Sequence, residues 1–170
     1  DLLLKIKSVY NLTKLNKIVE GGEERQDSVF NALNSISPSD DDLILVHDAA
    51  RPLLEQRILN QAIETAKEYG TALVALKAKD TIVKGEDFVS EYLNRNEIFQ
   101  VQTPQIFSFQ VFRQAFISAK NEGFIGTDES ILVHRASNPV KMVEGSSLNF
   151  KITTDSDLDL FRLITHIETL

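Results

Sequence analysis

The fold is decided by residues 43–76, which read LILVHDAARPLLEQRILNQAIETAKEYGTALVAL. The two ends of this stretch, Leu43–His47 and Thr71–Leu76, are apolar on successive residues, which is typical of buried parallel strands. Between them, Leu54–Tyr69 has apolar residues at helical spacing and is followed by Gly70, a common helix stop. Strand, helix and strand in this order predict a βαβ unit, so we expect an α/β fold.

Weaker patterns continue the alternation along the chain. Helices are expected to begin at Asp27 or Ser28, to cover Val111–Ala119, and to begin with a capping box formed by Thr154 and Asp157. Short strands are expected at Lys17–Glu20, Val140–Glu144 and Phe150–Thr153. Two further β-like pieces, Thr81–Val83 and Phe88–Tyr92, predict a hairpin. An isolated hairpin is marginal in water, so this one should pack on a partner subunit or fold back onto its own domain.

Length, composition and charge restrict the class of protein. A chain of 170 residues, 42% of them hydrophobic, is expected to form one domain. The absence of cysteine excludes disulfides and thiolate sites. A net charge of −7, spread along the chain, argues against non-specific binding of nucleic acid. The longest apolar runs are far shorter than the roughly 20 residues of a membrane span.

Polar clusters follow the strands, which is where ligands bind in open α/β sheets. In His47–Pro52, Asp48 could hold a metal ion or a sugar hydroxyl and Arg51 could bind a phosphate, or the two could pair to stabilise a turn. The segment Gly21–Arg25 could let the backbone approach a flat ligand, or be a plain strand-to-helix turn. Arg25 is expected to clamp a carboxylate in this loop.

Lys151 lies between the apolar neighbours Phe150 and Ile152, and could contact a polyphosphate or protect an edge strand from aggregation. No GxGxxG, GxxxxGK[ST] or GxSxG motif occurs, and the histidines are not at metal-ligand spacing. These clusters are weak signals singly, but their order along the chain is informative.

In that order the motifs resemble the sugar-phosphate cytidylyltransferases, and among them the family that acts on 2-C-methyl-D-erythritol 4-phosphate. The resemblance runs from about residue 17 to the end of the chain. The residues that carry it are Gly21–Val29, His47–Pro52, Asp80-Thr81, Arg95, Gln102–Phe107, Thr127–Glu129, Val143–Gly145 and Asn149–Thr153. Ribitol 5-phosphate cytidylyltransferases share most of this pattern but tend to have Ala-Val-Arg in place of Ala49-Ala50-Arg51.

The resemblance implies a Rossmann-like nucleotidyltransferase fold with a mostly parallel sheet and a protruding β-arm at residues 80–100 through which a homodimer forms. It implies a cytoplasmic enzyme that uses Mg²⁺, transfers CMP from CTP to a sugar-alcohol phosphate and releases pyrophosphate. The implied nucleotide-binding residues are Gly22, Glu23, Ser28 and Ala49, although family members more often have Asp or Ala in place of Glu23. The implied substrate-binding residues are Asp48, which would also bind the metal, Arg51, Thr103 and Thr127. The implied catalytic residues are Lys151, Arg95 and Thr81, the last two reaching from the arm to the neighbouring subunit.

One departure from the family pattern affects what the chain can do. Such enzymes open with a strand and a glycine-rich loop of the type Ala-Ala-Gly-x-Gly-x-Arg, followed by a lysine, and no counterpart precedes Gly21. The chain begins at Asp1, with neither an initiator methionine nor a signal-peptide pattern. We therefore expect a single domain over residues 1–170 that is truncated at its N-terminus. As it stands, we expect the chain to fold poorly and not to turn over CTP. The alternatives are a ribitol 5-phosphate cytidylyltransferase and a non-catalytic nucleotide-binding or dimerising module.

Overall fold

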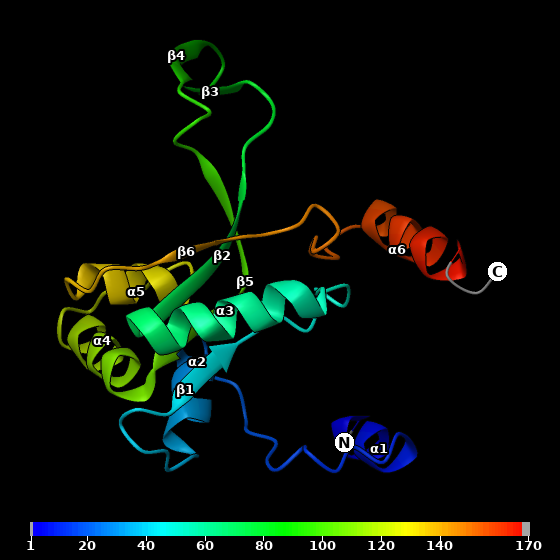
Figure 1. The fold of residues 1–170 in the computed structure, drawn as a ribbon, viewed down its shortest axis with the longest axis vertical. Coiled ribbons are helices and arrows are strands. Elements are labelled where there is room, and N and C mark those ends of the chain that lie inside the picture. Colours follow the sequence, from blue (N-terminus) through cyan, green and yellow to red (C-terminus); the bar gives the residue numbers. More distant parts are fainter. Residues whose placement is uncertain (1, 168–170) are drawn as a thin grey trace.

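A four-stranded mixed sheet forms the centre of the molecule in the computed structural model, which describes residues 2–167 (Figure 1). The strands, in spatial order, are β1 (Leu43–Val46), β5 (Phe99–Ser108), β2 (Thr71–Lys77) and β6 (Met142–Glu144). β1, β2 and β6 point the same way, whereas β5 runs antiparallel between β1 and β2, so the sheet is mixed. β2 is buried as predicted, but the prediction that β1 is buried is wrong, because β1 lies at the edge of the sheet and its Leu45 is 41% exposed. The sequence pattern did not indicate β5.

Helices cover both faces of this sheet, because successive side chains of a strand point to opposite faces. On β5, Ile106 belongs to a core cluster with α3 (Gln56–Tyr69), the predicted crossover helix. Its neighbour Phe107 belongs to a second cluster on the other face. That cluster includes side chains from α2 (Arg25–Asn34), α4 (Phe109–Asn121) and α5 (Glu129–Arg135).

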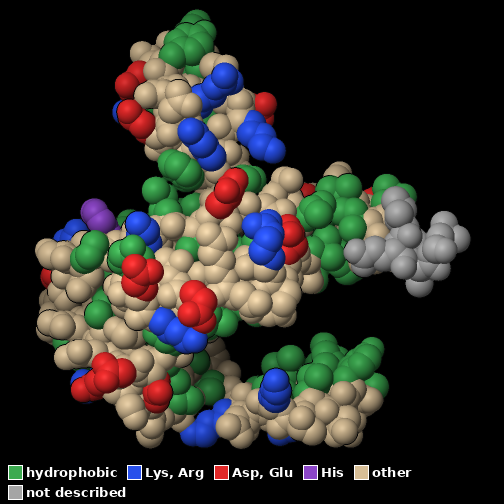
Figure 2. Space-filling model, in the orientation of Figure 1, with side chains coloured by type: hydrophobic (Ala, Val, Ile, Leu, Met, Phe, Trp, Pro, Cys, Tyr) green, Lys and Arg blue, Asp and Glu red, His purple; other side chains and the backbone are tan. Residues whose placement is uncertain are grey.

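Two helices and a hairpin lie away from the sheet (Figure 1). The helices are α1 (Leu2–Val9) and α6 (Asp155–Ile167), and the hairpin pairs β3 (Ile82–Gly85) with β4 (Val89–Leu93). Figure 2 shows hydrophobic side chains gathered on both helices and at the tip of the hairpin, where Phe88 is 87% exposed. Whether the hairpin is a dimerisation arm stays a prediction. No helix in residues 2–167 is both long and apolar enough to cross a membrane.

Local details differ from the sequence expectations at two strands and one helix start. Helix α2 begins at Arg25, with Glu24 as its N-cap and Asp27 as the reciprocal partner of a capping box. Lys17–Glu20 and Phe150–Thr153 are not strands. In the second segment the backbone turns to cap α6, because the N–H groups of Thr153 and Thr154 donate to Asp157 Oδ2. The capping box predicted for Thr154 and Asp157 is confirmed.

Candidate functional site

The loop that follows β1 is held in place by two side chains. Thr103 Oγ1, on β5, accepts a hydrogen bond from the backbone N–H of Asp48 at 3.0 Å and lies 3.0 Å from His47 Nδ1. His47 Nε2 lies 3.0 Å from the carbonyl oxygen of Arg51. In neutral His47, the Thr103 hydroxyl therefore donates to Nδ1 while Nε2–H donates to that carbonyl. These contacts fix both ends of the segment 48–51.

Asp48 lies at the centre of three cations. Its Oδ2 is 3.1 Å from Lys151 Nζ and 3.7 Å from Arg51 Nε, and its Oδ1 is 3.4 Å from Arg25 Nη2. Burial raises the pKa of Asp48, but the hydrogen bond from Lys151 and the charges of Lys151 and Arg25 together lower it more. The pKa of Asp48 is therefore below its ordinary value of 3.8, and the carboxylate stays ionised.

Arg25 is anchored by a buried acid on a different element. Its guanidinium binds both carboxylate oxygens of Glu129, at the start of α5, and one of these bonds measures 2.9 Å. The Glu129 side chain is only 1% exposed, and its hydrogen bond raises the pKa of Arg25 above the ordinary value. The prediction that Arg25 clamps a carboxylate of its own loop is wrong in its location, because the carboxylate belongs to Glu129, 104 residues away in sequence.

The segment that carries Lys151 is pinned to the β1 loop by its neighbours. Asn149 is fully buried and its Nδ2 donates to the Thr103 carbonyl oxygen at 2.8 Å. Arg51 Nη1 donates to the Asn149 carbonyl oxygen at 2.7 Å, and the Ile152 N–H donates to the Ala50 carbonyl oxygen at 2.9 Å. Lys151 therefore reaches Asp48 from an irregular segment, which corrects the expectation that it lies in a strand.

Five of the predicted residues line one cavity of about 240 Å³. They are Asp48, Arg51, Thr103, Thr127 and Lys151, and the cavity also contacts Arg25, Val101, Gln102, Gln105 and Asp128. Three cations and two hydroxyls facing a small polar cavity can bind and align a phosphate. The sequence patterns did not single out Gln105, Asn149 or His47 for the site, although all three lie inside the quoted motifs.

The predicted nucleotide-binding residues do not line this cavity. Gly22 N–H donates to Ser28 Oγ at 3.0 Å, which closes the turn before α2. The turn is so tight that a Cβ on Gly22 would lie 2.2 Å from Asp27 Cβ. Ser28 faces a separate cavity of about 630 Å³ beside β1, and Glu23 and Ala49 are exposed.

The two predicted arm residues also lie outside the cavity. Thr81 and Arg95 are exposed at the base of the β3–β4 hairpin, where Arg95 Nη1 donates to the Lys79 carbonyl oxygen at 3.0 Å. This bond joins the two sides of the hairpin base. Within the described chain, neither residue is brought to Asp48.

The donor set around Asp48 constrains how a metal ion could bind. Among the described residues no three His, Cys, Asp or Glu side chains are grouped as metal ligands. Mg²⁺ is commonly held by one or two carboxylates together with phosphates of the substrate. Asp48, with Asp128 lining the same cavity, fits an ion of that kind but not a site built from protein ligands alone.

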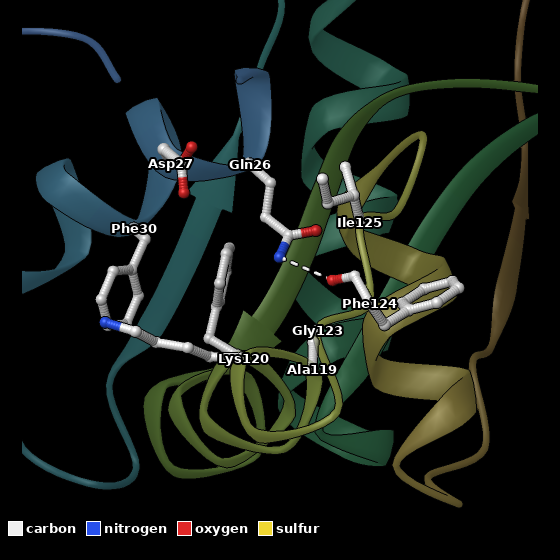
Figure 3. Close-up of a pocket in the computed structure, with 9 residues that line it drawn as sticks. Gln26, Asp27, Phe30, Ala119, Lys120, Gly123, Phe124 and Ile125 are labelled. Atoms are coloured by element: carbon white, nitrogen blue, oxygen red, sulfur yellow. Dashed lines mark hydrogen bonds between the residues drawn. The ribbon is translucent and has the colours of Figure 1, made fainter. Parts of the chain in front are cut away.

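A further pocket, between α2 and α4, contains none of the predicted residues (Figure 3). Gln26 Nε2 donates to the Phe124 carbonyl oxygen at 3.1 Å, and Gln26 Oε1 accepts from the Gly126 N–H at 2.8 Å. Lys120 Nζ lies 5.3 Å from the centre of the Phe30 ring. These contacts attach the loop before Thr127 to α2.

Comparison with known proteins gives one consistent family. The sequence model of 2-C-methyl-D-erythritol 4-phosphate cytidylyltransferase matches residues 5–166. The protein of that name from Geobacillus kaustophilus is 39% identical over 150 residues, which are 88% of this chain and 65% of the relative. The one from Bacillus cytotoxicus is 40% identical over 160 residues, or 94% of this chain and 70% of the relative.

Solved structures agree with the sequence comparison. The crystal structure of 2-C-methyl-D-erythritol 4-phosphate cytidylyltransferase from Thermus thermophilus is 34% identical, with a TM-score of 0.80. That match covers 87% of this chain and 72% of the solved one. The chain thus spans about two thirds of the length of the proteins it matches.

Proposed function

Because the chain belongs to the 2-C-methyl-D-erythritol 4-phosphate cytidylyltransferase family, we propose that the protein transfers the CMP group of CTP to 2-C-methyl-D-erythritol 4-phosphate. The observation that carries this proposal is the cavity in which Arg25, Arg51 and Lys151 surround Asp48. Such a site suits a phosphate, and the chain around it is acidic overall.

The chemistry of this transfer explains why cations are needed rather than an acid–base pair. An oxygen of the sugar phosphate forms a bond to the α-phosphorus of CTP, and the bond from that phosphorus to the pyrophosphate oxygen breaks. Both reactants are anionic, so catalysis depends on positive charge and alignment. Lys151 and Arg51 would supply charge at the reacting phosphates, while Thr103 and Thr127 would orient the substrate.

Magnesium is part of the proposal. Asp48 would hold Mg²⁺ jointly with phosphate oxygens, and the ion would supply further positive charge to the reacting phosphates. Gly22, Glu23, Ser28 and Ala49 would contact the nucleotide, as the family resemblance implies. A cytoplasmic location belongs to the same proposal.

We also propose a homodimer formed through the β3–β4 hairpin. The support for it is the exposure of apolar side chains on an isolated two-stranded sheet, including Phe88 at 87% and Tyr92 at 73%. In such a dimer, Thr81 and Arg95 would reach the sugar phosphate bound by the neighbouring subunit.

The test is pyrophosphate release from CTP and Mg²⁺ by the product of the complete coding sequence. One reaction contains 2-C-methyl-D-erythritol 4-phosphate and a parallel one contains ribitol 5-phosphate. Turnover with the first substrate alone is expected. Turnover with ribitol 5-phosphate alone would make that compound the substrate. No turnover with either compound, from a folded protein, would favour a non-catalytic module.

A further inference from the structure

Gln105, in the central strand β5, lines the cavity and has a buried amide donor that lacks a hydrogen-bond partner among the described residues. Gln105 is fully buried, and its Nε2 has no hydrogen-bond partner among the described residues. A buried donor that is left unpaired costs about 1–3 kcal/mol, so such groups are normally hydrogen-bonded to protein, water or a ligand. Gln105 lines the same cavity as Arg51, Thr127 and Lys151.

The position and orientation of this donor are both fixed. The backbone of Gln105 pairs with Val46 of β1 on one side and with Leu73 of β2 on the other. The Ser130 N–H donates to Gln105 Oε1 at 2.8 Å, which identifies the other terminal atom as the NH₂ group. The amide is therefore a preorganised donor that does not have to give up a protein partner to bind a ligand.

We infer that Gln105 is a binding residue for the sugar-alcohol phosphate, and that its Nε2 donates to an acceptor oxygen of this substrate. An NH₂ group can only donate, so the atom it meets must be a phosphate oxygen or the oxygen of a polyol hydroxyl. Thr103 lies two residues earlier on β5 and lines the same cavity, so one strand would present two side chains to one ligand. This inference rests on the proposed function.

Gln105→Glu is the most selective test of the inference. One carboxylate oxygen can still accept from the Ser130 N–H, while the other replaces the donor with an acceptor that repels the ligand oxygen. The matched control is Gln114→Glu, the same change at an exposed position of α4. Gln105→Met, which fills similar volume without an N–H donor, is the second variant if the buried carboxylate disturbs folding.

The measurement is calorimetric titration of each variant, made in the product of the complete coding sequence, with 2-C-methyl-D-erythritol 4-phosphate and, separately, with inorganic phosphate, alongside far-UV circular dichroism to confirm folding. We expect Gln105→Glu to weaken binding of the sugar phosphate at least about tenfold, as for a lost hydrogen bond to a charged group, with Gln114→Glu unchanged. An equal loss for inorganic phosphate would place the contact at the phosphate, and a loss confined to the sugar phosphate would place it at a hydroxyl. Wild-type affinity in folded Gln105→Glu and Gln105→Met would overturn the inference alone. A wild-type protein that binds neither probe would overturn the proposed substrate as well.

Discussion

The ion pair between Arg25 and Glu129 predicts an asymmetry between two single substitutions. The Glu129 side chain is 1% exposed and that of Arg25 is 39% exposed, so the acid depends on its partner more than the base does. Arg25→Met leaves a buried carboxylate without its guanidinium, and we expect a loss of about 3 kcal/mol, the lower end of the range for broken buried pairs. Glu129→Leu leaves a guanidinium that water still reaches, and we expect about half that loss.

The free energy of unfolding of the complete protein and its variants can be measured by urea titration followed by far-UV circular dichroism. The double variant Arg25→Met/Glu129→Leu should recover most of the loss, because a buried pair can often be replaced by apolar side chains at little cost. The control is the surface pair of Glu64 and Lys67 on α3, whose side chains are 70% and 59% exposed. Lys67→Met should cost less than about 1 kcal/mol.

Two outcomes would refute the coupling of Arg25 and Glu129. If Arg25→Met cost no more than Lys67→Met, the buried carboxylate would not depend on its guanidinium. If the double variant lost as much stability as the two single variants combined, the two side chains would not be coupled. Either result would mean that Arg25 is held near Asp48 by something other than Glu129.

Three further predictions concern the site and α6. Lys151→Ala should raise the pKa of Asp48, measured by carboxyl carbon NMR, and an unchanged pKa would contradict the contact between Lys151 and Asp48. The same substitution should slow the chemical step of the complete enzyme about 10²-fold. Arg95→Ala should raise KM for the sugar phosphate in steady-state assays while leaving KM for CTP nearly intact, and equal losses for both substrates would count against its proposed position. The backbone N–H of Thr153 and the hydroxyl and N–H of Thr154 lower the pKa of Asp157 to about 2, so its stabilisation of α6 is complete above the ordinary value of 3.8 and is lost as the pH falls toward 2. The protection factors of the α6 amides, which are corrected for the pH dependence of intrinsic exchange, should fall over that interval, and Asp157→Asn should abolish this fall.

The elements that could be predicted from sequence are those whose burial shows in a local pattern. β1, α3 and β2 have long apolar runs or strong helical spacing, and a capping box marks the start of α6. β5 was not predicted because Thr103, Pro104 and Gln105 interrupt its apolar pattern, and proline normally argues against a central strand. Helix α5 was missed because it is short and begins with two buried polar residues, Glu129 and Ser130.

The site residues likewise fall into those that a local sequence pattern predicts and those that it does not. Asp48 and Arg51 could be predicted because they follow an apolar run that predicts a strand, and ligands bind at the carboxyl ends of strands. Lys151 could be singled out by its position between Phe150 and Ile152, whereas Thr103 and Thr127 could be named only through the family resemblance. Glu129 and Gln105 are of residue types that are normally exposed, and their roles depend on partners 104 and 25 residues away. No local pattern contains that information.

The three cations around Asp48 differ in their freedom to move, and this difference suggests different roles for them in phosphate binding. Arg25 is tied to Glu129 and Arg51 to the Asn149 carbonyl oxygen, so both guanidiniums are fixed by groups other than Asp48. Lys151 contacts Asp48 and is 43% exposed, on a flexible stem. An arriving phosphate could therefore draw Lys151 away from Asp48 without breaking any other contact that holds the β1 loop. Asp48 would keep Arg25 and Arg51 as neighbours, and Lys151 would be the cation best able to follow charge that develops during the transfer.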